Sequence, residues 1–582
     1  MNSPSPAVDR DLTSIGEARD RARRAKAAQH DLERLSQQQV DTIVAAMADA
    51  AAAEAESLAA LAVQETSFGI VADKIQKNLF ASRTVHQFIQ PMKTVGVINS
   101  IQDRRVIEIA QPFGVVAGVI PSTNPTSTTI YKILIAIKAR CALVISPHPA
   151  AIDCIRRTAD LMNRAGLSAG LPRDSITWMD TVTLEGTQEL MSHRDVALIL
   201  ATGGMGLVRA AYSAGKPAYG VGPGNAPAYI ERSADLSKAV RDIIAGKTFD
   251  NGLLCSSENS VVVDRPVAVD VKREFENQGA RFLSTAESNA LAGVLVTQQR
   301  LLNPSLVGKT AIEVATAAGL SVPSDTRVLL APLEGVGREY PLSIEKLCPV
   351  LSFYEVDDWR QGCDRCIEIL HYGGMGHTMS IHSQNESVIL EFGLKKPASR
   401  IVVNTPSTLG SIGMTTGLDP AMTLGCGGYG GNITSDNISP RHLLNIKRLA
   451  YEIRPQGSSR NAQPTQTVTP AVERSGIDPL VLADRVETFL SGKGITPNPM
   501  STTTDNSPDI TTSELHSRST ESTPTPQPQQ EVTDFVCEED VRLAINKGQS
   551  ITIDENTIVT PAARDMEDNH RIFVYAGLST RQ

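Results

Sequence analysis

One cysteine lies in a sequence context that suggests chemistry. Cys255 belongs to FDNGLLCSSENS, residues 249–260, a run of small and polar residues with neither helical nor strand periodicity. Cysteine is often a small buried hydrophobic residue, and that alternative applies here as well. In a loop, however, a thiol that ionises is a strong nucleophile. Cys255 is therefore a candidate nucleophile, and the rest of the sequence has to support or weaken that interpretation.

Three further segments follow predicted strands, the edge at which open parallel sheets bind ligands. PSTNPTS, residues 121–127, holds Asn124 directly before a proline, so its backbone is restricted and its amide can face an oxyanion. ATGGMG contains Gly203 and Gly204 between a strand and a helix; it is not a complete GxGxxG motif, but its N–H groups could receive a phosphate. The glycines of KPAYGVGPGNAPAYI, including Gly222, allow the backbone to pack against a flat group.

The sequence predicts no metal site. Cys363 and Cys366 form a CxxC pair, but no second pair of ligands lies at zinc-site spacing, and the pair fits one face of a helix. Redox use of the pair is the alternative. Eight cysteines in 582 residues do not make a disulfide framework.

The length and net charge of the chain indicate how many domains it has and which partners are disfavoured. A chain of 582 residues predicts several domains, and a net charge of −9 argues against nucleic acid as the main partner. The polar N-terminus does not resemble a signal peptide, and no apolar run is long enough for a membrane span. We therefore expect a cytoplasmic protein that does not bind a membrane.

The order of elements predicts an α/β fold. The first hundred residues have helical spacing, and a strand pair near 100–115 is followed by strands that alternate with helices to about residue 239. A second α/β block covers 240–430 and ends in the glycine-rich loop GCGGYGGN. Alternation of apolar strands with helices indicates parallel sheets covered on both faces.

The composition changes after Pro455. Residues 456–530 are rich in Ser, Thr, Pro and Gln, which predicts a disordered linker. An amphipathic helix is predicted within it at 478–491, where Asp478 and Pro479 provide a start signal. One such helix is not stable alone, so we expect it to dock on a partner or to fold back on its own enzyme. Residues 531–582 predict a small segment of helix, strand and helix.

Seven motifs in this order resemble the CoA-acylating branch of the aldehyde dehydrogenase superfamily: IPSTNPTSTTIYK, ISPHP, AAYSAGKPAYGVGPGN, KTFDNGLLCSSENSVVVD, EKLCPVLSFY, GGMGHT and GCGGYGGN. The branch includes the enzymes of ethanolamine and propanediol utilisation and the N-terminal half of bifunctional aldehyde–alcohol dehydrogenase. The resemblance covers about residues 25–455. It implies a Rossmann-like NAD-binding domain with a helical N-terminus in 1–239, a catalytic domain in 240–430, and a C-terminal arm in 431–455. A small oligomerisation arm would then support a homodimer or homotetramer.

The resemblance also implies roles for residues. Cys255 would attack the aldehyde, and the Asn124 side chain with the Cys255 N–H would hold the oxyanion. Glu345 would bind the nicotinamide ribose, and His148 stands where hydrolytic relatives have a lysine, so NAD is expected and NADP stays open. The residues expected to bind the cofactor are Ser122, Thr123, His148, Pro149, Gly203, Gly204, Gly222 and Glu345. His377 and Ser256 are candidates for the CoA or substrate pocket, although a loop histidine is often structural.

The acyl acceptor follows from a missing carboxylate. Hydrolytic members carry a glutamate in the stretch that corresponds to PAYGVGPGNAPAY, residues 217–229, which contains no Asp or Glu. Without a base water is a poor acceptor, whereas the thiol of coenzyme A needs less help. We expect a small aldehyde, CoA and NAD(P) to give acyl-CoA and NAD(P)H. The alternatives are a hydrolytic dehydrogenase that releases the free acid and a catalytically silent scaffold, which the intact Cys255 and Asn124 disfavour.

The tail resembles the encapsulation peptides of enzymes in bacterial microcompartments. Helix 478–491 between flexible linkers, together with TIVTPAARD, is similar to elements of such proteins. The resemblance implies shell proteins as partners and the microcompartment lumen as the location. The aldehyde itself stays open among small C2 to C4 aldehydes, sulfoacetaldehyde and amino-substituted aldehydes.

Overall fold

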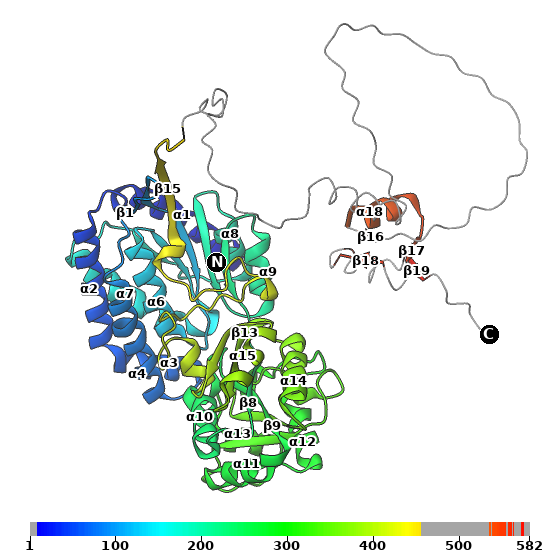
Figure 1. Cartoon of the computed structure of the whole chain (residues 1–582). Helices are drawn as coiled ribbons and strands as arrows, with labels where there is room; N and C mark the ends of the chain where they lie inside the picture. The colour runs from blue at the N-terminus through cyan, green and yellow to red at the C-terminus, as the bar shows by residue number, and fades with distance from the viewer. Residues whose placement is uncertain are drawn as a thin grey trace, which may run out of the picture. The chain divides into compact units, whose positions relative to one another are not determined.

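The computed structural model describes residues 9–454 and, in the C-terminal part, 535–536, 538–553, 557–560, 563 and 572–575. The chain divides into two units, 1–465 and 466–582. The first contains two parallel sheets and a small antiparallel one (Figure 1). The predicted linker 456–530 and its helix 478–491 lie outside the described residues.

Helices form the N-terminal part of the first unit, as the sequence predicted. The first two begin at polar caps: Asp9 accepts from the N–H groups of the first turn, and Ser36 forms a capping box with Gln39. Small alanines recur on the buried face of the first helix, which allows close packing against the neighbouring sheet layer. The helical elements are α1 (Arg10–Leu32), α2 (Gln37–Ala53), α3 (Ala55–Thr66), α4 (Val71–Leu79), the π-helical turn η1 (Phe80–Thr84) and α5 (Val85–Ile89).

A five-stranded parallel sheet follows, with the order β5-β4-β3-β6-β7. Its central strand is buried at every position, because helices cover both faces. The strands are β3 (Val115–Val119), β4 (Leu143–Ser146), β5 (Ile176–Trp178), β6 (Val196–Thr202) and β7 (Ala218–Val221). The connecting helices are α6 (Pro125–Lys138), α7 (Ile152–Ser168), α8 (Leu184–Ser192) and α9 (Met205–Ser213). Its strand order, with a helix after each of the strands β3, β4, β5 and β6, is that of a Rossmann-like sheet.

A seven-stranded parallel sheet forms the second α/β block, with the order β10-β11-β12-β9-β8-β13-β14. Its strands are β8 (Ala226–Ile230), β9 (Glu258–Asp264), β10 (Ala280–Phe282), β11 (Val328–Pro332), β12 (Val350–Val356), β13 (Gly376–His382) and β14 (Ala398–Val403). Its helices are α10 (Leu236–Thr248), α11 (Arg265–Asn277), α12 (Thr285–Leu295), α13 (Ala311–Ala317), α14 (Trp359–Tyr372), α15 (Glu386–Lys395) and α16 (Ser407–Ser411).

The second sheet begins earlier than the sequence suggested. β8 pairs with β9 and β13, so the change of sheet lies between Val221 and Ala226. The predicted boundary at residue 239 falls inside α10, after the second sheet has begun. Alternating strands and helices do not reveal which sheet a strand joins, because that depends on its hydrogen-bonding partners.

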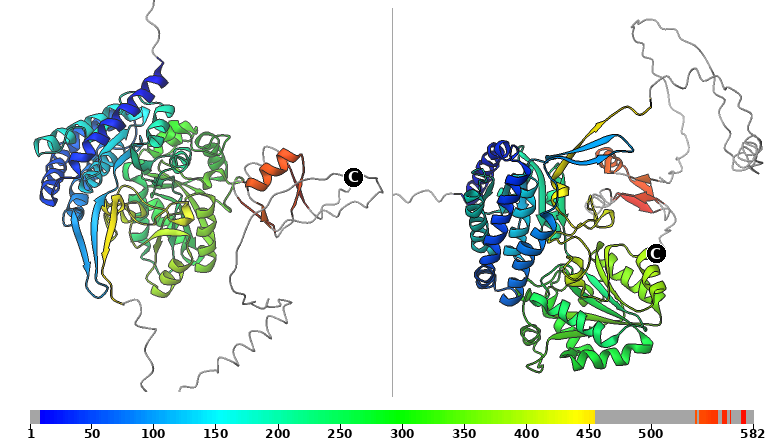
Figure 2. Two further views of the ribbon diagram at one scale, coloured as in Figure 1. Left: turned by 90° about the horizontal axis from the view of Figure 1, so that it is seen from above. Right: turned by 60° about the vertical axis from the view of Figure 1, so that its left-hand side comes forward.

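The antiparallel arm combines distant parts of the chain. The strands β1 (Gly96–Ile101) and β2 (Val106–Pro112) form the hairpin expected near 100–115, and β15 (Leu444–Ala450) pairs with β2 along its whole length. Figure 2 shows these strands projecting beyond the helices and the parallel sheets.

The C-terminal unit contains one helix and short strands. These elements are β16 (Phe535–Val536), α18 (Glu538–Lys547), β17 (Ile551–Ile553), β18 (Ile558–Val559) and β19 (Phe573–Tyr575). Parallel pairs form between β16 and β18 and between β17 and β19. The expected helix after residue 560 falls almost entirely outside the described residues. None of the helices in the described ranges combines the length and apolar character that crossing a bilayer requires.

Candidate active site

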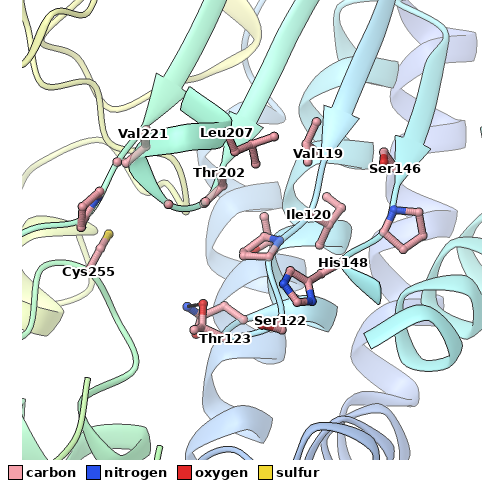
Figure 3. A pocket seen from close by; sticks show the side chains of 18 of the residues that line it. Val119, Ile120, Ser122, Thr123, Ser146, His148, Thr202, Leu207, Val221 and Cys255 are labelled. Atoms are coloured by element: carbon pink, nitrogen blue, oxygen red, sulfur yellow. Dashed lines mark hydrogen bonds between the residues drawn. The ribbon is translucent and has the colours of Figure 1, made fainter. Parts of the chain in front are cut away.

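A pocket of about 450 Å³ opens at the carboxyl ends of β3, β4, β6 and β7 (Figure 3). Its lining brings together ten of the twelve residues singled out from the sequence. They are Ser122, Thr123, Asn124, His148, Pro149, Gly203, Gly204, Gly222, Cys255 and Glu345. Cys255 lies across the pocket from Ser146 and His148 (Figure 3).

Cys255 follows a strained turn in the connection from α10 to β9. The 3-10 turn η3 (Phe249–Gly252) holds Asp250 and Asn251 at φ of 49° and 54°. Side-chain hydrogen bonds support this left-handed backbone: Asn251 Nδ2 donates to the Gly308 carbonyl at 2.8 Å, and Asp250 Oδ1 accepts from the Ile70 N–H at 2.7 Å. The turn thereby presents Cys255, which is partly exposed, to the pocket.

The groups around the Cys255 thiol change its pKa in opposite directions. Burial raises the pKa of Cys255 to about 12, and the nearby Glu345 and Cys426 raise it further. The guanidinium of Arg400 and the N–H of Cys255 itself lower this pKa. The resting thiol is therefore protonated near neutrality, and stabilisation of its anion is a requirement for nucleophilic chemistry.

Asn124 is held in a defined orientation at the start of α6, where Pro125 occupies the first helical position. Its Nδ2 donates to the Leu253 carbonyl and to Thr123 Oγ1, both at 3.2 Å, and its Oδ1 accepts from Lys77 Nζ. The amide N–H₂ group thus faces the loop that carries Cys255. An oxyanion formed on a Cys255 adduct would receive a donor from this group by replacing one of its two present acceptors.

A buried charge network supports Asn124, and the sequence did not reveal it. Lys74, Lys77 and Asp250 are at most 2% exposed; both lysines bind Asp250 Oδ2, with a Lys74 Nζ distance of 2.9 Å. Lys74 also donates to the Thr123 carbonyl at 3.1 Å. Burial lowers the pKa of Lys77 to about 8, an effect that Asp250 opposes. The only local signal is two lysines three residues apart on a helix, which is also typical of an exposed face; the partner lies more than 170 residues away.

Glu345 lines the same pocket near Cys255. Its Oε1 accepts from the Gly224 N–H at 2.8 Å, and burial raises its pKa to about 8. Gly224 also packs against the Cys255 loop: a Cβ there would overlap the Cys255 carbonyl oxygen and lie 3.2 Å from Cγ of His377. Only glycine fits this close approach of the two backbones.

The far part of the pocket has the features of a dinucleotide site. The first N–H groups of α9 receive no side-chain cap, and Gly203 and Gly204 leave them accessible to a phosphate. His148 Nδ1 accepts from the Ala150 N–H at 3.1 Å, so its Nε2 carries the proton, and burial lowers its pKa. Glu345 is the one carboxylate in the lining within residues 9–454.

His377 and Ser256 do not line this pocket. Ser256 is buried and its Oγ donates to the Thr408 carbonyl at 3.4 Å. His377 is 1% exposed, its Nδ1 lies 3.0 Å from Thr378 Oγ1, and its Nε2 has no partner within the described residues. Burial and Arg400 lower the pKa of His377 to about 3, so its ring is neutral.

The CxxC pair lies on a helix, as the spacing suggested. Cys363 and Cys366 are buried on α14, against the core of the second sheet.

Comparison with known proteins agrees with this arrangement. The model of the aldehyde dehydrogenase family matches residues 12–417. The bifunctional aldehyde-alcohol dehydrogenase AdhE of Escherichia coli is 41% identical over 75% of the chain, which spans about half the length of that relative. The acetylating succinate-semialdehyde dehydrogenase of Clostridium kluyveri is 37% identical over 74% of the chain and 94% of its own length.

Solved structures show the same fold. An acetylating aldehyde dehydrogenase from Geobacillus thermoglucosidasius has 50% identity and a TM-score of 0.76, over 77% of this chain and 99% of its own. A propionaldehyde dehydrogenase from the fucose utilisation microcompartment of Clostridium phytofermentans has 30% identity and a TM-score of 0.67, over 74% and 96%. The predicted resemblance is confirmed. With its two parallel sheets, its antiparallel arm and a cysteine at the pocket between them, the chain belongs to the aldehyde dehydrogenase family.

Proposed function

We propose that the protein is a CoA-acylating aldehyde dehydrogenase that oxidises a small aldehyde to its acyl-CoA and reduces NAD(P). The observation that carries the proposal is the lining of the pocket: a cysteine and an oriented amide meet there, and Glu345 is the one carboxylate in the lining within residues 9–454. The stretch 217–229 supplies none. Relatives named as acetylating support the same choice of acceptor.

The proposed chemistry uses Cys255 twice. Its thiolate attacks the aldehyde carbon, and the Asn124 Nδ2 group and the Cys255 N–H stabilise the resulting oxyanion. A nicotinamide held beside Glu345 would accept the hydride that leaves this carbon, and the carbon would then remain on Cys255 as a thioester. Attack by the CoA thiolate then forms acyl-CoA and returns the Cys255 thiolate.

Cofactor binding is proposed for the sequence-derived set in the same pocket. The α9 N–H groups at Gly203 and Gly204 would receive the pyrophosphate, with Gly222 beside them. Ser122 and Thr123 border the Cys255 end of the pocket, where Glu345 would bind the nicotinamide ribose. His148 and Pro149 would face the adenosine ribose, where His148 Nε2–H can donate to a hydroxyl or a phosphate oxygen.

We also propose that the enzyme works inside a bacterial microcompartment as a homo-oligomer. Residues 478–491 would dock on microcompartment shell proteins, and the arm formed by β1, β2 and β15 would support a homodimer or homotetramer. The neighbour from a fucose utilisation microcompartment supports the setting. The aldehyde would be a small C2 to C4 compound, with sulfoacetaldehyde or an amino-aldehyde as alternatives.

Product analysis with and without CoA tests the proposed reaction. We expect NADH and acyl-CoA in equal amounts only when CoA is present, and no NADH from the Cys255→Ala variant. Cys366→Ala, which removes a buried thiol of α14, is the matched control and should keep its activity. Release of free acid at full rate without CoA would instead identify a hydrolytic enzyme.

A further inference from the structure

Arg400 is a buried cation in an unusual environment. It lies on β14 and is 3% exposed; its hydrogen-bond acceptors are neutral, while the Cys426 thiol and the charge of Asp436 also favour its protonated form. Those hydrogen bonds go to the carbonyls of His377 (2.9 Å), Gly425 (2.6 Å) and Ser435 (3.0 Å), to Asn437 Oδ1 (3.4 Å) and to Thr378 Oγ1 (3.3 Å). It forms no ion pair with any carboxylate in residues 9–454.

A buried charge at the position of Arg400 destabilises the folded state. Carbonyl oxygens satisfy the N–H donors but do not neutralise the charge, and burying a charge without a paired carboxylate destabilises the folded state. Burial lowers the pKa of Arg400, yet a guanidinium stays protonated in proteins. The five acceptors explain why a residue with several donors stands here, but they do not use its charge, so the charge calls for a further explanation.

The position of Arg400 connects it to Cys255. Its Nη2 holds the His377 carbonyl, the His377 ring packs against Gly224, and Gly224 lies directly against the Cys255 carbonyl. The His377 ring is the side chain on this path, and Gly224 lets it lie close to the Cys255 loop because a Cβ there would overlap the Cys255 carbonyl oxygen. Arg400 therefore lies one layer of residues behind Cys255.

The other ionisable groups near Cys255 do not supply this charge. Glu345 and Cys426 both oppose an anion on Cys255. Lys77 is committed to Asp250 and Asn124, and Lys247 binds Asn259 Oδ1 at 3.2 Å and the Lys346 carbonyl at 2.7 Å. His377 is neutral.

We propose that Arg400 is a positioning residue for the reactive state of Cys255: its buried charge stabilises the thiolate from behind the loop, without touching the aldehyde. The inference rests on the proposed function, since a thiolate matters only if Cys255 is the nucleophile. It adds to that function a residue outside the pocket. The anions it serves are the Cys255 thiolate and, after attack, the adjacent oxyanion.

The rate at which iodoacetamide alkylates Cys255, followed by mass spectrometry as a function of pH in the full chain, measures the thiolate directly. Because the pKa of the Cys255 thiol lies near 12, the profile is compared below its midpoint, where the alkylation rate is proportional to the thiolate fraction. We expect Arg400→Met to lower the rate at each pH about tenfold or more, which corresponds to a midpoint higher by about one pH unit or more. Arg400→Lys keeps the charge and should restore the wild-type midpoint.

Two further variants separate charge from structure. Thr378→Val removes a hydrogen bond from Arg400 but leaves its charge, so the midpoint should stay unchanged. Asn437→Asp places a carboxylate beside Arg400 Nη1 and should raise the midpoint even if Arg400→Met does not fold. An unchanged midpoint in Arg400→Met or Asn437→Asp, or a shift in Thr378→Val equal to theirs, would overturn the proposal.

This experiment needs neither aldehyde nor CoA. If the wild type forms free acid but the Arg400 variants still shift the alkylation midpoint, the reaction is wrong and the role of Arg400 stands. If acyl-CoA forms but the midpoint does not change in the Arg400 variants, the proposed reaction stands and the role of Arg400 is wrong.

Discussion

Lys77 holds the Asn124 side chain in place. Its Nζ binds Asn124 Oδ1 and Asp250, whereas Lys74 binds Asp250 and the Thr123 carbonyl but not Asn124. We therefore expect Lys77→Met to lower kcat about 10- to 100-fold, because the oxyanion donor loses its fixed orientation. Lys74→Met is the matched control, since it also removes one cation from Asp250.

Steady-state kinetics of the two variants, with denaturation curves for both, would check this role. If kcat falls equally in both variants, the loss comes from the unbalanced charge of Asp250 and not from the orientation of Asn124. A larger loss in Lys77→Met at equal stability is the expected result.

Glu345 and Arg400 act on Cys255 in opposite directions. Because the charge of Glu345 raises the pKa of the thiol, Glu345→Gln should lower the midpoint of Cys255 alkylation while raising KM for NAD. The alkylation profile and a cofactor titration measure the two effects separately. An upward shift of the midpoint would contradict the assigned geometry.

At the scale of elements, α6 connects the strands that form the pocket. Lys132 on α6 is fully buried and donates to the Val119 carbonyl at 2.7 Å and to the Leu200 carbonyl at 2.9 Å, near the ends of β3 and β6. Burial lowers its pKa from 10.5 to about 7. The helix thereby ties the two central strands together directly below the pocket.

This lysine makes stability depend on pH. Between pH 7 and 10.5 the unfolded chain holds the Lys132 proton and the folded chain does not, so stability rises with pH in that window. Below pH 7 both states are protonated and the cost of burying the charge is constant. We expect the Tm of the wild type to rise by a few degrees from pH 7 to 9.5, and a smaller rise for Lys132→Met in differential scanning calorimetry. The same slope in both proteins would argue against Lys132 as its source.

Local sequence predicted the elements and most of the pocket for a physical reason. Asn124, Gly203 and Cys255 stand in short motifs at strand ends, and the ends of parallel strands meet at one edge. The pairing of Lys77 with Asp250, the environment of Arg400 and the sheet to which β8 belongs all depend on contacts between distant segments. A single sequence does not encode those contacts in any local pattern.

At the scale of the whole molecule, the first unit contains every residue of the candidate site. We expect a chain that ends at Thr465 to keep kcat and KM within about twofold of the full chain, since no site residue is lost. A chain that ends at Leu443 lacks β15 and exposes the edge of β2, which should promote association or insolubility. Activity assays and size-exclusion chromatography compare the two truncated chains. If the chain that ends at Leu443 is soluble and keeps its oligomeric state and activity, β15 has no structural role.

The pairing of β2 with β15 also has a consequence during synthesis. The hairpin leaves the ribosome early, but Arg448 and its neighbours, which pair with Glu108 and complete the arm, follow more than 330 residues later. For most of translation the outer edge of β2 has no strand beside it, and such an edge can pair with another nascent chain. Slow elongation between the hairpin and β15 should therefore favour misassembly between neighbouring ribosomes, and a chaperone that shields strand edges should raise the yield of active enzyme.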